Sequence, residues 1–76
     1  MIEVHYIQPN KTTKVRHADT LQFSDITSNA KGLNAEHYIV RNSNNSWYVY
    51  HVDTYGELKI FPPDQLDGAI MWARHQ

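Results

Sequence analysis

The sequence lacks cysteine throughout its 76 residues, which excludes a disulfide framework and any zinc or iron–sulfur site built on thiolates. It has no apolar run of about 18 residues, so no membrane-spanning helix is expected. The opening residues, MIEVHYIQPNK, have no basic leader followed by an apolar segment, so no secretion signal is expected. Because a small fold without disulfides suits a reducing compartment, we expect the protein in the cytoplasm.

Neither sign of charge dominates, since 7 Lys and Arg stand against 8 Asp and Glu, for a formal net charge of −1. Such a chain has no long-range field to attract a nucleic acid duplex, and it is not an acidic mimic of DNA. Any partner must therefore be recognised by local contacts. The length predicts a single domain, residues 1–76, with a thin core, because a domain of this size buries only about 60% of its unfolded surface.

The chain begins with apolar and polar residues that alternate from Ile2 to Tyr6, which is the period of a half-buried strand. Turn-forming residues at 8–10 precede a second candidate strand at 12–17. That strand carries cations at Lys14 and Arg16, a pattern that protects an edge strand from pairing with other chains. We therefore predict an N-terminal hairpin whose second strand lies at a sheet edge.

Residues 19–34 have a helical spacing of apolar side chains, namely Leu21, Phe23, Ile26 and Ala30. Gly32 stands where a helix would end in a left-handed turn. This predicts a short helix near residues 24–31. Its Ser, Asp, Thr and Asn residues form helices poorly, so packing by Phe23, Ile26 and Leu33 must stabilise it.

The strongest strand signals are at residues 36–41 and 47–52, which are rich in Tyr, Val and Ile and are joined by five Asn and Ser residues. Asp53 and Gly56 fit a type I turn with a left-handed bulge residue, leading to a third strand at 58–61. These segments predict a three-stranded antiparallel meander.

A C-terminal helix is predicted after Pro62 and Pro63, which cannot donate hydrogen bonds to a sheet. Asp64 is a candidate cap. The buried face of the helix repeats at a spacing of three and four residues: Leu66, Ala69, Ile70 and Ala73. The fold class is therefore α+β, a small antiparallel sheet with a short middle helix and a C-terminal helix packed on one face.

The bulged turn predicts that Tyr50 lies near Ile60, and it places five residues on one sheet face: Trp47, Val49, His51, Lys59 and Phe61. The C-terminal helix can cover one face of the sheet. The other face either remains exposed as an aromatic binding surface or is covered by residues 19–34. We predict that the five residues are exposed and bind a partner.

Three functions fit these features. A cross-strand pair of His37 and His51 would suit a small His-dependent ribonuclease, although none of the five histidines has metal-ligand spacing. Strand aromatics with nearby Arg41 and Lys59 would suit a single-stranded nucleic-acid binder, but the cations are scattered. Tyr and Trp in strands occur more often in cores and protein interfaces.

The sequence therefore favours a non-enzymatic module, without metal or cofactor, that docks on and modulates or inhibits a larger protein assembly. The partner is expected to be another protein or a second copy of the chain. Small inhibitors from phages and other mobile elements are similar in size and composition, which is an analogy only.

Overall fold

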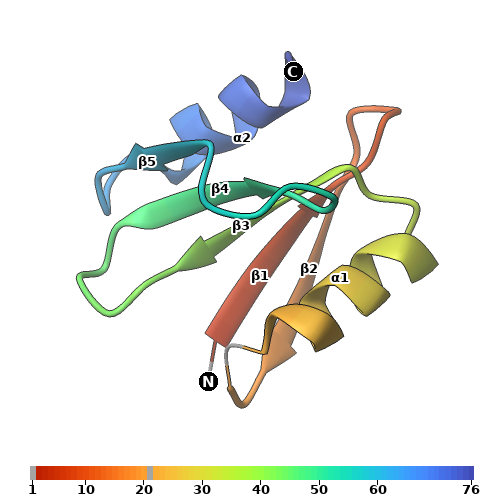
Figure 1. The fold of residues 1–76 in the computed structure, drawn as a ribbon. Helices are drawn as coiled ribbons and strands as arrows, with labels where there is room; N and C mark the ends of the chain where they lie inside the picture. Colours follow the sequence, from red (N-terminus) through yellow and green to blue (C-terminus); the bar gives the residue numbers. More distant parts are fainter. Residues whose placement is uncertain (1, 21) are drawn as a thin grey trace.

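The computed structural model describes residues 2–20 and 22–76, and Figure 1 shows them as one antiparallel sheet with two helices. The elements in chain order are β1 (Ile2–Ile7), β2 (Thr13–Ala18), α1 (Phe23–Gly32), β3 (His37–Arg41), β4 (Trp47–His51), β5 (Lys59–Phe61) and α2 (Leu66–Arg74). The five strands follow the order β2-β1-β3-β4-β5. The predicted α+β fold is confirmed, with its N-terminal hairpin, its meander and β2 at an edge.

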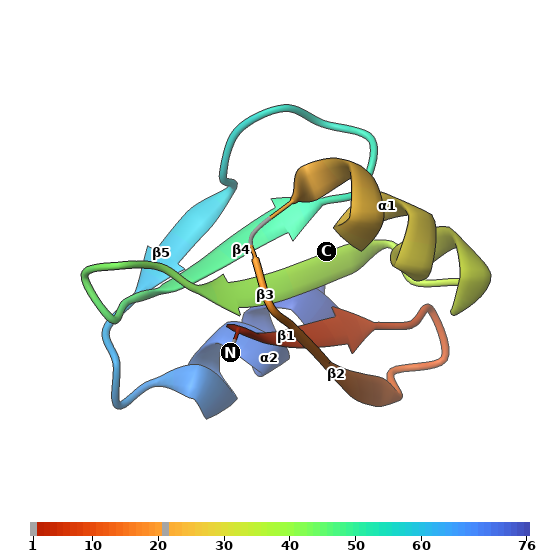
Figure 2. The ribbon, with the colours of Figure 1, turned by 90° about the horizontal axis from the view of Figure 1, so that it is seen from below.

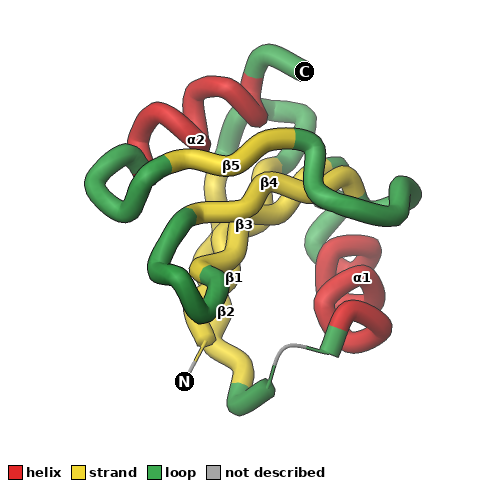
Figure 3. Tube along the Cα trace, turned by 60° about the vertical axis from the view of Figure 1, so that its left-hand side comes forward, coloured by secondary structure: helices red, strands yellow, loops and turns green. Residues whose placement is uncertain are grey.

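The two helices lie on opposite faces of the sheet (Figures 2 and 3). Alternation along each strand sends successive side chains to the two faces and produces two cores. The core under α1 contains Val4, Tyr6, Ile26, Ala30, Ala35, Tyr38, Val40 and Tyr50. The core under α2 contains Ile7, Ile39, Trp47, Val49, Ala69 and Ala73. Of the two possibilities for the second face, the structure shows a mixture: α1 covers the part over β1 and β3, and the part near β5 stays exposed, with Ile60 at 46%.

The turns use residues that tolerate left-handed backbone angles. Asn45 has a φ of 67°, and the β3–β4 reversal closes with a 3.0 Å hydrogen bond from the Asn42 amide to the Ser46 carbonyl. Gly56 has the expected positive φ, 86°. Both angles are ones that Asn and Gly adopt at low cost.

Two predicted helix ends are wrong. The left-handed residue after α1 is Asn34, with a φ of 56°, and Gly32 remains inside the helix. The residue that caps α2 is Gln65, without a side-chain hydrogen bond, so Asp64 does not act as the cap. Leu21, which the helical pattern included, lies outside the described residues.

The register between β4 and β5 also differs from the prediction. Ile60 is paired with Tyr48, two positions from the expected Tyr50, because the connection from β4 to β5 is longer than a bulged two-residue turn. A shift of two residues leaves every side chain on its original face. The assignment of Trp47 and Phe61 to one face is therefore confirmed. In the part of the chain that is described, no helix is long and apolar enough to cross a membrane.

Candidate functional site

The face predicted to bind a partner is closed by α2. Trp47 is 3% exposed and Val49 is fully buried against that helix. His51 and Phe61 are half-buried at the rim, and Lys59 is exposed. The prediction that this face is open is therefore wrong for its central residues, because α2 packs on this side of the sheet rather than on the other.

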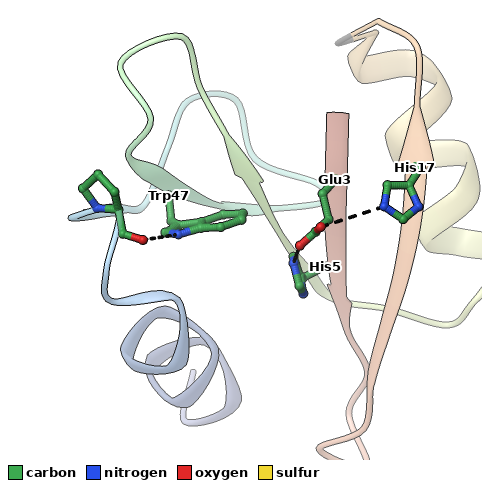
Figure 4. Close-up of polar contacts among 5 residues, drawn as sticks. Glu3, His5, His17 and Trp47 are labelled. Atoms are coloured by element: carbon green, nitrogen blue, oxygen red, sulfur yellow. Dashed lines mark hydrogen bonds and ion pairs between the residues drawn. The ribbon is translucent and has the colours of Figure 1, made fainter. Parts of the chain in front are cut away.

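Three contacts hold the Trp47 side chain in place. Its indole N–H donates a 3.1 Å hydrogen bond to the Pro63 carbonyl in the connection between β5 and α2 (Figure 4). The His5 ring meets it edge-on at 5.5 Å, and the Arg41 guanidinium lies 4.4 Å from its ring centre. These contacts make Trp47 a structural residue that ties β4 to the start of α2.

Glu3 lies between two histidines at this end of the sheet (Figure 4). Its carboxylate accepts a 2.5 Å hydrogen bond from His5 Nε2, and its other oxygen is 3.8 Å from His17 Nε2. His5 is only 6% exposed, so it cannot reach a substrate. Among the described residues, no group of three or more His, Asp or Glu side chains is arranged to hold a metal ion. The arrangement orients Glu3 and joins β1 to β2.

A cleft of about 690 Å³ lies beside Glu3 and Trp47. Its wall is made of Ile2, Glu3, Arg41, Asn42, Ser43, Asn45, Trp47 and Leu66. It is a wide, open depression with one carboxylate, one guanidinium and no nucleophile activated by a neighbouring base. The cleft therefore does not define a reaction.

The histidine pair is present as predicted, since His37 lies opposite His51 with the rings 5.0 Å apart. Burial, and then the charge of His51, lower the pKa of His37. His37 is 5% exposed, and the small cavity beside it, about 80 Å³, is too narrow for a nucleotide. A buried imidazole cannot exchange protons with a bound RNA, so the geometry does not favour the ribonuclease reading.

The opposite face of the sheet is only partly covered, because α1 lies far from β5 (Figures 1 and 2). Tyr48 and Ile60 are cross-strand partners on this face, and Ile60 is 46% exposed. The Tyr48 ring stacks near Tyr50, which in turn meets the ring of Phe23 at 5.3 Å. Phe23, also 46% exposed, comes from the start of α1. We call Phe23, Tyr48 and Ile60, with Tyr50 beneath them, the open strip.

The tyrosines next to the open strip form a stacked and uncharged layer on the sheet. Tyr6, Tyr38 and Tyr50 occupy one cross-strand row, and the Tyr38 and Tyr50 rings stack at 5.2 Å. Burial, then the neighbouring phenols, raise the pKa of Tyr38 to about 12. Burial also raises the pKa of Tyr50, with a smaller contribution from the charge of Glu57. These phenols carry no charge at neutral pH.

The sequence predicted the strands that carry Tyr48 and Ile60, but the exposed surface was predicted on the other face. Alternation places Tyr48 and Ile60 on the sheet face opposite to the one that carries Trp47, and the strand sequences alone predict this. Which face α2 covers depends on the path of residues 62–65, and no local pattern encodes that path. Comparison with family models, curated proteins and solved structures finds no match to this chain, so its surfaces are interpreted from their own chemistry.

Proposed function

We propose that this chain is a non-enzymatic protein-binding module that docks on a larger protein, and modulates it, through the open strip. The observation that carries the proposal is the row from Phe23 through Tyr50 and Tyr48 to Ile60, whose two ends, Phe23 and Ile60, are each 46% exposed. Scattered apolar residues are normal on surfaces, whereas a contiguous apolar group marks an interaction site. Aromatic anchors dominate the binding energy of protein interfaces.

The surroundings of the open strip favour a protein over a nucleic acid. Glu57 lies close enough to Tyr50 to add to the rise in the pKa of its phenol. A carboxylate beside the aromatic rings repels a phosphate backbone, whereas proteins that stack single strands surround the rings with cations. Asn44, which donates a 3.0 Å hydrogen bond to the Tyr48 hydroxyl, adds a polar but uncharged rim.

The proposal includes the setting expected from the sequence. The partner is a larger protein of the cytoplasm, and a second copy of the chain is the other candidate. Origin in a phage or another mobile element remains an analogy of size and composition.

The test compares two charged substitutions at equally exposed apolar positions. Ile60→Asp places a carboxylate in the open strip, and Met71→Asp places one on α2, where the side chain is 51% exposed. Immobilised wild type and both variants, each checked for folding by circular dichroism, are exposed to nuclease-treated cell extract, and bound proteins are identified by mass spectrometry.

We expect a protein that is retained by the wild type and by Met71→Asp but lost with Ile60→Asp, because a buried unpaired carboxylate opposes docking. Equal retention by all three folded proteins would mean that the open strip is not the docking surface. Binding that disappears on nuclease treatment would favour the nucleic-acid function instead.

A further inference from the structure

The outer edge of β2 has a row of backbone groups that no other described strand pairs with, because β2 is the last strand on this side of the sheet. The Gln8 amide donates a 2.9 Å hydrogen bond to the Thr12 carbonyl, which fixes the phase of the β1–β2 ladder. Alternation then directs the amides and carbonyls of Thr13, Val15 and His17 away from β1. No described strand uses these groups, and only the Val15 carbonyl is shown with a side-chain donor, Arg16.

The side chains on this edge are cationic and exposed. Lys14 and Arg16 lie on the α1 face, and Val15, 40% exposed, lies on the α2 face between Thr13 and His17. The sequence has no Asp or Glu between Glu3 and Asp19. Within the described residues, neither Lys14 nor Arg16 forms a salt bridge. The edge is therefore positive in a chain whose remainder is negative.

The Arg16 side chain bonds to one of the backbone groups that an added strand would use. Its Nη1 donates a 2.9 Å hydrogen bond to the Val15 carbonyl, one of the outward-facing groups. Self-pairing of β2 is unfavourable, because an antiparallel pair centred on Val15 would place Lys14 opposite Arg16 of the other copy, and one centred on Arg16 would oppose two guanidinium groups. Cations at an edge thus reject copies of the chain and select for opposite charge.

We propose that the β2 edge binds an extended acidic segment of a partner protein, which adds a sixth strand to the sheet. On such a strand, acidic residues face Lys14 and Arg16, and the alternate residues are apolar or small and face Val15. Main-chain hydrogen bonds supply affinity and the charge pattern supplies specificity.

The outward backbone groups of β2 fit a peptide ligand better than a nucleic acid. Outward amides and carbonyls that alternate in a strand register match another peptide strand, whereas a phosphate backbone uses only the donors. The edge also has no Phe, Tyr or Trp ring to stack a base between Thr13 and Ala18. The inference rests on the proposed function only in taking the partner to be a protein, and it concerns a different surface from the open strip.

The experiment uses short fluorescent peptides with blocked ends. In the first peptide Glu alternates with Val, and in a scrambled control the same residues are arranged with the Glu residues contiguous. A third peptide replaces Glu with Lys, and single-stranded oligothymidylate is the nucleic-acid probe. Fluorescence anisotropy with the full chain should show binding of the alternating peptide that weakens with salt, and at least about tenfold weaker binding of the others.

Four variants separate charge from strand pairing. Arg16→Glu should weaken binding of the Glu peptide by about tenfold or more, while Lys31→Glu, an exposed cation of α1, should leave it nearly unchanged. Val15→Pro removes one outward amide that the β1–β2 ladder does not use, and should abolish binding. Val15→Ala keeps that amide and should retain most of the affinity.

Equal affinity for the alternating and scrambled peptides would overturn the proposal, as would tighter binding of the oligonucleotide or no binding of any peptide. If Val15→Pro fails to fold, the comparison of the alternating and scrambled peptides on wild type still decides the question. Loss of the Glu peptide on Ile60→Asp would mean that it binds the open strip instead. Failure of these peptides leaves the Ile60→Asp capture result intact, so the two proposals fail separately.

Discussion

Replacement of Trp47 by Ala should strongly lower the free energy of unfolding, because Trp47 is a core residue and not part of an exposed binding surface. The side chain is 3% exposed, its indole N–H bonds to the Pro63 carbonyl, and Arg41 packs over its ring. Truncation of a buried Trp costs about 3 to 5 kcal/mol through lost transfer energy and the cavity that remains. The carbonyl left without its donor adds about 1 kcal/mol.

That loss is large compared with the total stability. A chain of 76 residues is expected to have a free energy of unfolding of about 4 to 11 kcal/mol. Trp47→Ala should therefore lose from about a third to all of the free energy of unfolding. Trp47→Phe keeps a ring in the core, so its free energy of unfolding should lie between those of Trp47→Ala and the wild type.

Urea unfolding followed by circular dichroism measures the effect. Met71→Ala, at a side chain that is 51% exposed, is the matched control and should change the free energy of unfolding by less than about 0.5 kcal/mol. A loss below about 1 kcal/mol in Trp47→Ala would refute the reasoning, since it would mean that α2 does not close over this face.

Three further predictions concern backbone and ionisation. Gly56→Ala should lower the free energy of unfolding by about 1 kcal/mol in urea titration because its φ is 86°, whereas Gly32→Ala, at the end of α1 with open space around it, should not destabilise. Burial and the charge of His51 lower the pKa of His37, so as the pH falls His37 is protonated in the unfolded chain before it is protonated in the folded one. Stability should thus fall as the pH drops below about 6.5, and it should fall less in His37→Gln; an equal fall in both proteins would contradict the assignment. Spectrophotometric titration should detect a phenol that ionises near pH 12 and is missing from Tyr38→Phe.

Local patterns predicted most of the fold. Alternation located the strands, Asn and Gly located the left-handed turns at Asn45 and Gly56, and the spacing of Ala69 and Ala73 located the buried side of α2. Cross-strand placement of His37 and His51 also followed from strand periodicity and the loop length. These features depend on neighbours in the sequence, so one chain is sufficient to identify them.

The exposed surface was not predictable in the same way. Both faces of β4 are apolar, with Val49 on one and Tyr48 on the other, so hydrophobicity does not distinguish the covered face from the open one. The choice depends on where the chain crosses after Phe61, which is a tertiary property. The cations of β2 were visible in the sequence. Which backbone groups of β2 point away from β1 could be known only from the hydrogen-bond register of the structure.

Thiol labelling tests most directly whether the sheet is exposed at Ile60 and closed by α2 at Val49. Because the chain has no cysteine, Ile60→Cys and Val49→Cys each introduce a single thiol. We expect the Ile60→Cys thiol to react with a maleimide under native conditions almost as fast as in urea. The Val49→Cys thiol should react only through unfolding, slower by about a thousandfold or more. Equal rates, or faster labelling of Val49→Cys, would contradict this arrangement.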